Sequence, residues 1–168
     1  MNIVTHALAP VIFAHVALSR SKSLGRWSLV AIGVAGALPD LLTPHMTLES
    51  RMTSWSHGLP CWATLTVVLF VISLMSKQRL TIRLSWILSF SYLFHLFCDA
   101  VSGGINVLYP VKNFIWGAYW VSPLLWIPLD IICVLTFYYL FRFRALWARR
   151  REALGRLNHP DVPSDHET

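Results

Sequence analysis

Residues 84–101 read LSWILSFSYLFHLFCDAV, an apolar run that contains one histidine, His95, and one acid, Asp99. The run is close to the ~20 residues that a helix needs to cross a bilayer. A carboxylate at mid-bilayer costs roughly 2.5 to 3.5 kcal/mol even on lenient insertion scales, so an acid in such a run indicates a functional site. His95 and Asp99 are four residues apart and share one face of a helix, which suits two ligands of one metal ion.

The rest of the chain has the composition of a membrane protein. Apolar residues make up 55% of the sequence, charged residues make up 13%, and there are 8 tryptophans, which is unusual for a soluble domain. We predict an all-α polytopic membrane protein in which about five transmembrane or membrane-embedded helices form one bundle, over residues 1–18, 27–43, 57–76, 84–101 and 121–141. The first two runs are shorter and more polar, so four spans with re-entrant segments are the alternative.

The basic residues predict an orientation. Of the 14 Lys and Arg residues, all except Arg51 and Lys112 fall on one side of this topology. Because Lys and Arg favour cytoplasmic loops, we predict a multi-pass protein of the bacterial inner membrane with its N-terminus outside and its C-terminus in the cytoplasm. Residues 1–157 form the membrane domain, including a basic juxtamembrane segment, and residues 158–168 form a disordered polar tail.

The same charges identify the expected partners. The basic cluster after Phe141 is expected to bind anionic membrane lipids, at ~1 kcal/mol per residue near the surface. This accounts for the net charge of +6, so no nucleic acid is expected as a partner. The sequence predicts no particular oligomeric state.

The predicted topology brings five ionisable residues to the outer end of the bundle. His6 is near the start of the first run, Asp40 near the end of the second and His57 at the start of the third, and His95 and Asp99 finish the fourth. A single histidine would be interpreted as a structural residue, satisfied by a backbone carbonyl or a neighbouring helix. Three histidines and two acids at one depth instead predict a polar site.

Three further residues are weaker candidates. Asp130 lies about 14 Å below the outer end of the last run, at ~1.5 Å per residue. One interpretation is that Asp130 is an additional metal ligand or catalytic residue. The other is that it is a buried acid that accepts a hydrogen bond from Trp or Tyr. His15 is nine residues after His6 and points away from the cluster, so its role is predicted to be structural. His45, in the outer loop, is a minor candidate.

The chemistry that these residues permit is metal-assisted hydrolysis. Imidazoles with carboxylates suit zinc, manganese and iron about equally, and a bound divalent metal lowers the pKa of its water to about 7. The sequence contains no GxSxG and no GxxxxGK[ST] motif, which argues against a serine nucleophile and a phosphate-binding loop. A site open to the outer leaflet favours a lipid, lipid-linked or periplasmic phosphoester as substrate. Asp99 and Asp40 are the candidate catalytic residues.

Two functions of other classes stay open. One is a small transporter or ion-conducting protein, in which Asp40, Asp99 and Asp130 form a cation or proton path with the histidines. Such a path needs polar groups that continue to the other face, and beyond Asp130 the last run offers Thr136 and residues 138–139. The other is a non-enzymatic membrane scaffold that holds a structural metal.

The sequences around the candidate residues follow an order found in a known family. They are Thr5-His6, Gly36-Ala37-Leu38-Pro39-Asp40, Ser56-His57, and His95-Leu96-Phe97-Cys98-Asp99 followed by Gly104 and Leu108-Tyr109-Pro110. This order resembles the bacterial membrane-bound metal-dependent hydrolases described as LexA-regulated, or YdjM-like. That family is distantly similar to zinc-dependent phospholipase C and P1 nuclease, helical enzymes that cleave phosphodiesters.

The resemblance implies a ligand set and a metal. Asp40, His57, His95 and Asp99 would hold one ion, for which zinc is the first choice, and Asp99 would bridge to another ion that His6 helps to hold. Each ligating imidazole needs an acceptor for its second ring N–H. The nearest acceptors in the sequence are Ser56, Thr5 and backbone carbonyls.

The chain also departs from the family pattern. Many members carry a second acid soon after the Pro-Asp pair, where this chain has Leu41 after Pro39-Asp40. Many also carry a His-Arg pair followed by Thr-His, where this chain has Arg51 followed by Ser56-His57. The soluble relatives add a late His-x-x-x-acid pair, of which this chain retains Asp130. The resemblance therefore leaves the number of metals open and does not predict a complete three-zinc site.

Overall fold

The computed structural model describes residues 3–18, 24–44, 47–76, 81–143, 146–147 and 150. Within them the chain is mostly helical, as predicted. The long helices coincide with the apolar runs and are α1 (Ile3–Leu18), α2 (Arg26–Leu42), α4 (Leu59–Met75), α5 (Ile82–Val101) and α6 (Trp126–Tyr138). The shorter elements are α3 (Leu48–Met52), the 3₁₀ turns η1 (Trp55–His57) and η2 (Pro123–Leu125), and the π-helical turn η3 (Tyr139–Phe143) that extends α6.

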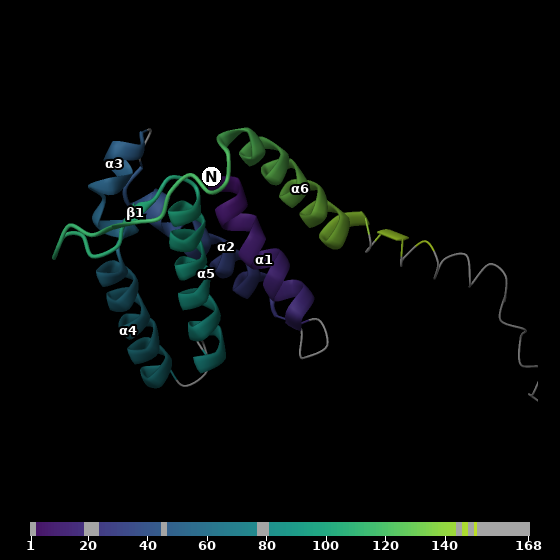
Figure 1. The fold of residues 1–168 in the computed structure, drawn as a ribbon. Helices are drawn as coiled ribbons and strands as arrows, with labels where there is room; N and C mark the ends of the chain where they lie inside the picture. Colours follow the sequence, from purple (N-terminus) through teal and green to yellow (C-terminus); the bar gives the residue numbers. More distant parts are fainter. Residues whose placement is uncertain are drawn as a thin grey trace, which may run out of the picture.

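Helix α5 lies at the centre of the bundle. It packs against α2 and α4, while α1 packs against α2, α5 and α6. Figure 1 shows α4 and α5 side by side, with α6 on the outer side of α1. Because consecutive helices run in opposite directions, the ends of α2 and α5 and the starts of α1 and α4 meet at one end of the bundle. The candidate site residues lie at this end.

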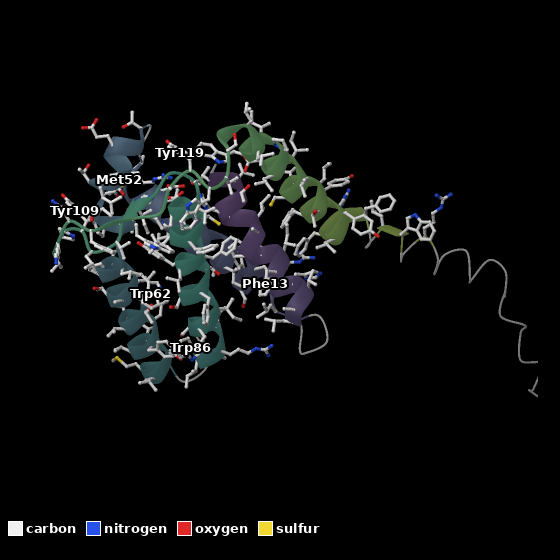
Figure 2. The ribbon with its side chains drawn as sticks, viewed as in Figure 1. Phe13, Met52, Trp62, Trp86, Tyr109 and Tyr119 are labelled. Carbon is white, nitrogen blue, oxygen red and sulfur yellow. The ribbon has the colours of Figure 1, made fainter. Side chains whose placement is uncertain are left out.

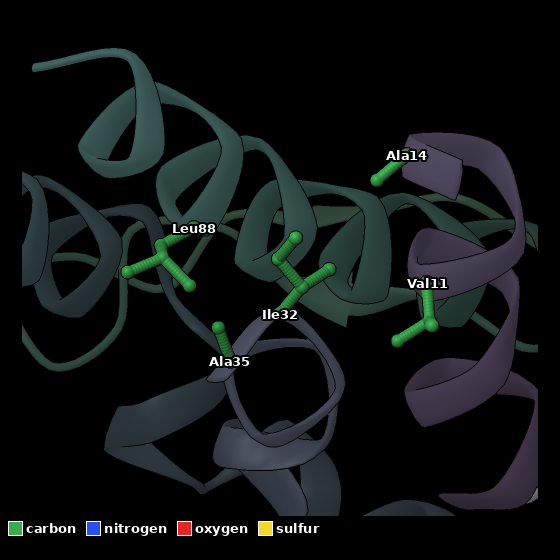
Figure 3. Close-up of a cluster of buried hydrophobic side chains, with 5 residues drawn as sticks. All are labelled: Val11, Ala14, Ile32, Ala35 and Leu88. Atoms are coloured by element: carbon green, nitrogen blue, oxygen red, sulfur yellow. The ribbon is translucent and has the colours of Figure 1, made fainter. Parts of the chain in front are cut away.

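Small and branched side chains fill the interior away from that end. Val11 and Ala14 from α1, Ile32 and Ala35 from α2, and Leu88 from α5 form one buried cluster (Figure 3). Small residues at a helix interface let the two backbones approach closely.

The outer surface of the helices is apolar. The side chain of Phe13 on α1 is 76% exposed and that of Trp86 on α5 is 51% exposed (Figure 2). A soluble monomer rarely exposes continuous apolar surface of this extent. Among the described residues, the segments Ile82–Val101 and Trp126–Phe143 are long and apolar enough to cross a membrane, and Ile3–Leu18 and Leu59–Met75 are apolar but shorter. These features support membrane embedding, and the five crossings stay a prediction.

A two-stranded antiparallel sheet, which the all-helical prediction lacks, covers the site end of the bundle. Strands β1 (Ile105–Asn106) and β2 (Ile115–Trp116) pair Ile105 with Trp116 and Asn106 with Ile115. Gly117 follows at φ 101°, and a Cβ there would lie 2.1 Å from the carbonyl oxygen of Ala100. Glycine therefore allows the hairpin to lie directly against the end of α5. The strands are too short to show a periodic pattern in the sequence.

Two of the described basic residues lie at the same end of the bundle, and the predicted orientation stays a prediction. Arg26 begins α2 and Arg83 lies in the first turn of α5, so both are at the bundle end opposite Asp40 and Asp99. The basic residues Arg20, Lys22, Lys77 and Arg79, the minor candidate His45 and the predicted tail at residues 158–168 lie outside the described residues.

Candidate metal centre

The structure brings all five predicted site residues together at one end of the bundle. His6 lies in the first turn of α1, Asp40 near the end of α2, and His57 at the end of η1; His95 and Asp99 lie in the last turns of α5. This is the end at which Figure 1 shows α3 and β1. Residues separated by more than ninety positions in the sequence thus form one cluster.

Four of these residues point ligand atoms at a common centre. One ligand atom each from Asp40, His57, His95 and Asp99 lies within 4.8 Å of all the others. Nε2 of His57 is 3.2 Å from Oδ1 of Asp40 and 3.5 Å from Oδ2 of Asp99. Nε2 of His95 is 3.5 Å from Oδ1 of Asp40 and 3.3 Å from Oδ2 of Asp99. Each imidazole therefore faces both carboxylates.

These separations fit a shared metal ion. Two atoms that each lie about 2.0–2.1 Å from a tetrahedral zinc ion are ~3.4 Å apart, and the imidazole–carboxylate pairs span 3.2 to 3.5 Å. A charge-assisted N–H···O hydrogen bond is shorter, about 2.7–2.9 Å. Nε2 of His95 and Oδ2 of Asp99 are buried without a hydrogen-bond partner, although buried polar atoms are normally paired. A metal ion would satisfy both atoms.

The site is buried except at Asp40. The side chains of His57, His95 and Asp99 are at most 2% exposed, whereas that of Asp40 is 15% exposed. Asp40 is therefore the most exposed member of the four-residue cluster.

The second ring nitrogen of His57 and that of His95 each lie within hydrogen-bond distance of a polar group. Nδ1 of His95 donates to the carbonyl oxygen of Gly36 at 2.7 Å. Nδ1 of His57 lies 2.9 Å from Oγ of Ser54 and 3.1 Å from Oγ of Ser56. These contacts orient both rings so that Nε2 faces the carboxylates, the arrangement common among metal-binding histidines. Ser56 and a backbone carbonyl were among the predicted acceptors, whereas the hydroxyl of Thr5 instead donates to Asp130.

The loop before α4 holds His57 in place. The hydroxyl of Ser56 donates to the carbonyl oxygen of Pro39 at 2.8 Å, which ties η1 to the end of α2 beside Asp40. The backbone N–H of Leu59 donates to the carbonyl oxygen of Val107 at 2.8 Å. A Cβ on Gly58 would lie 2.5 Å from the carbonyl oxygen of Tyr109, so glycine lets the sheet and its connection close over this loop.

Two further side chains, those of Arg51 and His6, approach the other oxygen of Asp99. Nη1 of Arg51 donates to Oδ1 of Asp99 at 3.0 Å, and Nε2 of His6 lies 3.3 Å from the same oxygen. The ring of His6 also stacks near that of His95, with 3.9 Å between centroids. His6 is thus in the cluster but outside the four-residue set, and its role as a ligand stays a prediction.

Arg51 was not among the site residues predicted from the sequence. This arginine is one of two basic residues predicted to lie on the outer side. That position was itself a signal, because an arginine in a predicted outer loop departs from the positive-inside rule and so indicates a specific role. The structure shows the reason, since its guanidinium is buried against Asp99.

Asp130 and His15, two of the weaker candidates, lie outside the four-residue set. Asp130 accepts a hydrogen bond from Thr5 and so links α6 to α1, and it does not belong to the four-residue set found within the described residues. The predicted Trp or Tyr partner is therefore replaced by a threonine. The ring of His15 packs on Phe141 with 4.5 Å between centroids, in keeping with the structural role predicted for it.

Comparison with known proteins identifies the family. The family model described as YdjM inner membrane protein matches residues 1–157. The chain belongs to this family. No curated protein and no solved structure matches it. Membership in the YdjM inner membrane family, together with the apolar helices, indicates an inner-membrane location. The family description states a location and no reaction.

Proposed function

We propose that this YdjM family member is an integral membrane metal-dependent hydrolase that acts on a phosphoester. The observation that carries the proposal is the set of four imidazole–carboxylate separations, each between 3.2 and 3.5 Å. Two of the atoms in this set, Nε2 of His95 and Oδ2 of Asp99, are buried without a hydrogen-bond partner. Asp40, His57, His95 and Asp99 would hold the ion. Zinc is the first metal to test, with manganese and iron as alternatives.

A divalent metal bound here would supply a water of lowered pKa and a Lewis acid that polarises the phosphoester. The chain's own residues contribute the rest. Gly36 and Ser54 orient the two imidazoles, and Arg51 provides a fixed positive charge beside the carboxylates. Catalytic metal sites keep a position open for water, and the exposed side of Asp40 offers that access.

The orientation and substrate class belong to the same proposal. Five crossings would place this end of the bundle outside, because the basic residues of the loops and of the C-terminal segment lie on the other side. The substrate would then be a lipid, a lipid-linked molecule or a periplasmic phosphoester. The distant similarity to phospholipase C and P1 nuclease has no support among solved structures, so the proposal rests on the site.

The interior of the bundle favours a hydrolase over an ion or proton path. The buried histidine, arginine and acidic side chains in the described part of the chain are His6, Arg51, His57, His95 and Asp99, and all lie at the site end. Towards the other end the described interior contains Val11, Ile32 and Leu88 and serines such as Ser85, which donates to the backbone. A conducting path would need ionisable groups or water along that length.

The decisive experiment measures metal and activity in the same preparation. Protein purified in detergent is analysed for bound transition metals, stripped with a chelator and assayed on bis(4-nitrophenyl) phosphate before and after zinc or manganese is restored. We expect metal to be bound and activity to return with it. Protein that binds no transition metal would refute the hydrolase and also the metal-holding scaffold, while bound metal without hydrolysis of any phosphoester would favour the scaffold.

A further inference from the structure

The two carboxylate oxygens of Asp99 have different partners. Oδ2 faces Nε2 of His95 at 3.3 Å and Nε2 of His57 at 3.5 Å, toward the proposed ion. Oδ1 accepts a hydrogen bond from Nη1 of Arg51 at 3.0 Å and lies 3.3 Å from Nε2 of His6. A bridging carboxylate would present one oxygen to each of two ions. Here the second oxygen already binds a cation that belongs to the protein.

We propose that the guanidinium of Arg51 takes the place of a second metal ion, so that the centre binds one divalent ion beside a fixed arginine cation. The inference rests on the proposed metal centre and specifies its stoichiometry. A second ion would need Oδ1 of Asp99 and Nε2 of His6 as ligands, and Arg51 occupies that oxygen. Arginine keeps its proton in proteins, so the positive charge stays there throughout the working pH range.

Arg51 is built into the site and is not a surface contact. Its side chain is 5% exposed, and Nη2 donates to the carbonyl oxygen of Ser102 at 3.4 Å. A Cβ on Gly103 would lie 2.8 Å from Nη2, and the backbone of Gly103 has φ 134°. Glycine at the exit of α5 therefore leaves the space that the guanidinium fills. The position of the cation is set by α3 and by the chain that follows Asp99.

The charge of the site agrees with one ion. Asp40 and Asp99 balance a single divalent ion, which leaves the charge of Arg51 available for an anionic substrate group. A second divalent ion would add two further positive charges beside Arg51 in a buried site, where uncompensated charge is strongly disfavoured. Arg51 thus supplies positive charge next to Asp99 without the cost of holding another ion.

The test counts bound ions with manganese as the probe. Wild-type protein in detergent is stripped, titrated with Mn²⁺ and examined by elemental analysis and electron paramagnetic resonance. We expect one Mn²⁺ per chain and the spectrum of an isolated ion. Two ions with an exchange-coupled spectrum would overturn this inference and leave the hydrolase proposal standing. Protein that binds no Mn²⁺, Zn²⁺ or Fe²⁺ would overturn both.

Substitution of Arg51 gives the sharper outcome. Arg51→Met frees Oδ1 of Asp99, so we expect a second, weaker Mn²⁺ to bind at millimolar concentration. Arg51→Lys retains the charge and is expected to bind one ion. Lys112→Met removes an exposed lysine that is also predicted to lie on the outer side, and this control is likewise expected to bind one ion. An Arg51→Met protein that still saturates at one Mn²⁺ would contradict the inference. The wild-type count decides the matter alone if this variant does not fold.

Discussion

The carbonyl oxygen of Gly36 on α2 accepts a hydrogen bond from Nδ1 of His95 on α5 at 2.7 Å. The same glycine faces the backbone of α1, since a Cβ at this position would lie 2.2 Å from the carbonyl oxygen of His6. One residue without a side chain thus orients the ring of His95 on α5 and lets α1 bring His6 to the site.

Gly36→Ala should disturb both relationships. We expect a loss of roughly 1–3 kcal/mol in the free energy of unfolding, because overpacking at a tight crossing forces the backbones apart, together with weaker metal binding. Thermal unfolding and metal content in detergent measure the two effects. Gly25→Ala is the matched control, since a Cβ there meets nothing within 4 Å. Similar behaviour of the two variants would show that the α1–α2 crossing is not tight at Gly36.

His95→Ala should lower metal affinity by more than about tenfold, because even residues that only orient a ligand contribute about 10–100-fold. His15→Ala removes a ring that packs on Phe141 outside the cluster, so its metal content should stay at the wild-type level. Elemental analysis of both variants at equal protein concentration makes the comparison. Equal losses of metal in the two variants would show that the metal site is not on the face of the bundle that carries His95.

Asp99→Asn should lose both metal and hydrolysis, because an amide carries no charge to balance the ion. It also leaves the buried guanidinium of Arg51 unpaired, which typically costs about 3–5 kcal/mol of stability. The readouts are metal content, phosphodiester hydrolysis and thermal unfolding. Glu49→Gln removes an exposed acid on α3 and should change none of them. Normal metal binding by Asp99→Asn would remove Asp99 from the ligand set.

Asp130→Ala separates the two roles that the sequence left open. Because Asp130 accepts a hydrogen bond from Thr5, we expect α6 to be held less firmly on α1, with a loss of ~1–3 kcal/mol for the donor left unpaired. Metal content should be unchanged. A stoichiometric loss of metal would instead make Asp130 a ligand.

The orientation is tested with reporter fusions. Fusions after Lys77 and after Arg151 should report a cytoplasmic position, and a fusion after Lys112 should report export, because basic residues concentrate on the cytoplasmic side. An exported reporter after Lys77 or Arg151 would contradict the predicted topology and the substrate classes inferred from it. The contacts among Asp40, His57, His95 and Asp99 would be unaffected by that result.

Several features follow from local sequence. The apolar runs predict the helices because each run is long enough to be helical in a membrane and has few polar interruptions. The spacing of His95 and Asp99 predicts that both side chains share one face, since a helix repeats every 3.6 residues. Alternation of helix direction then predicts that His6, Asp40 and His57 meet them at the same end.

The remaining features depend on contacts between segments far apart in the chain. No periodic pattern indicates that β1 pairs with β2 or that Asp130 bonds Thr5, because each contact joins single residues from separate elements.

The sequence by itself determined the helices, their common end and the histidines and acids gathered there, because these depend on composition, length and helical repeat. Tertiary structure alone decided how those residues are used. It turned Nε2 of His57 and His95 toward both carboxylates, and it placed Arg51 on Oδ1 of Asp99. Which oxygen of Asp99 faces Arg51 and which faces the imidazoles of His57 and His95 depends on how closely α1, α2 and α3 approach α5. That approach is set by packing at residues such as Gly36 and Gly103.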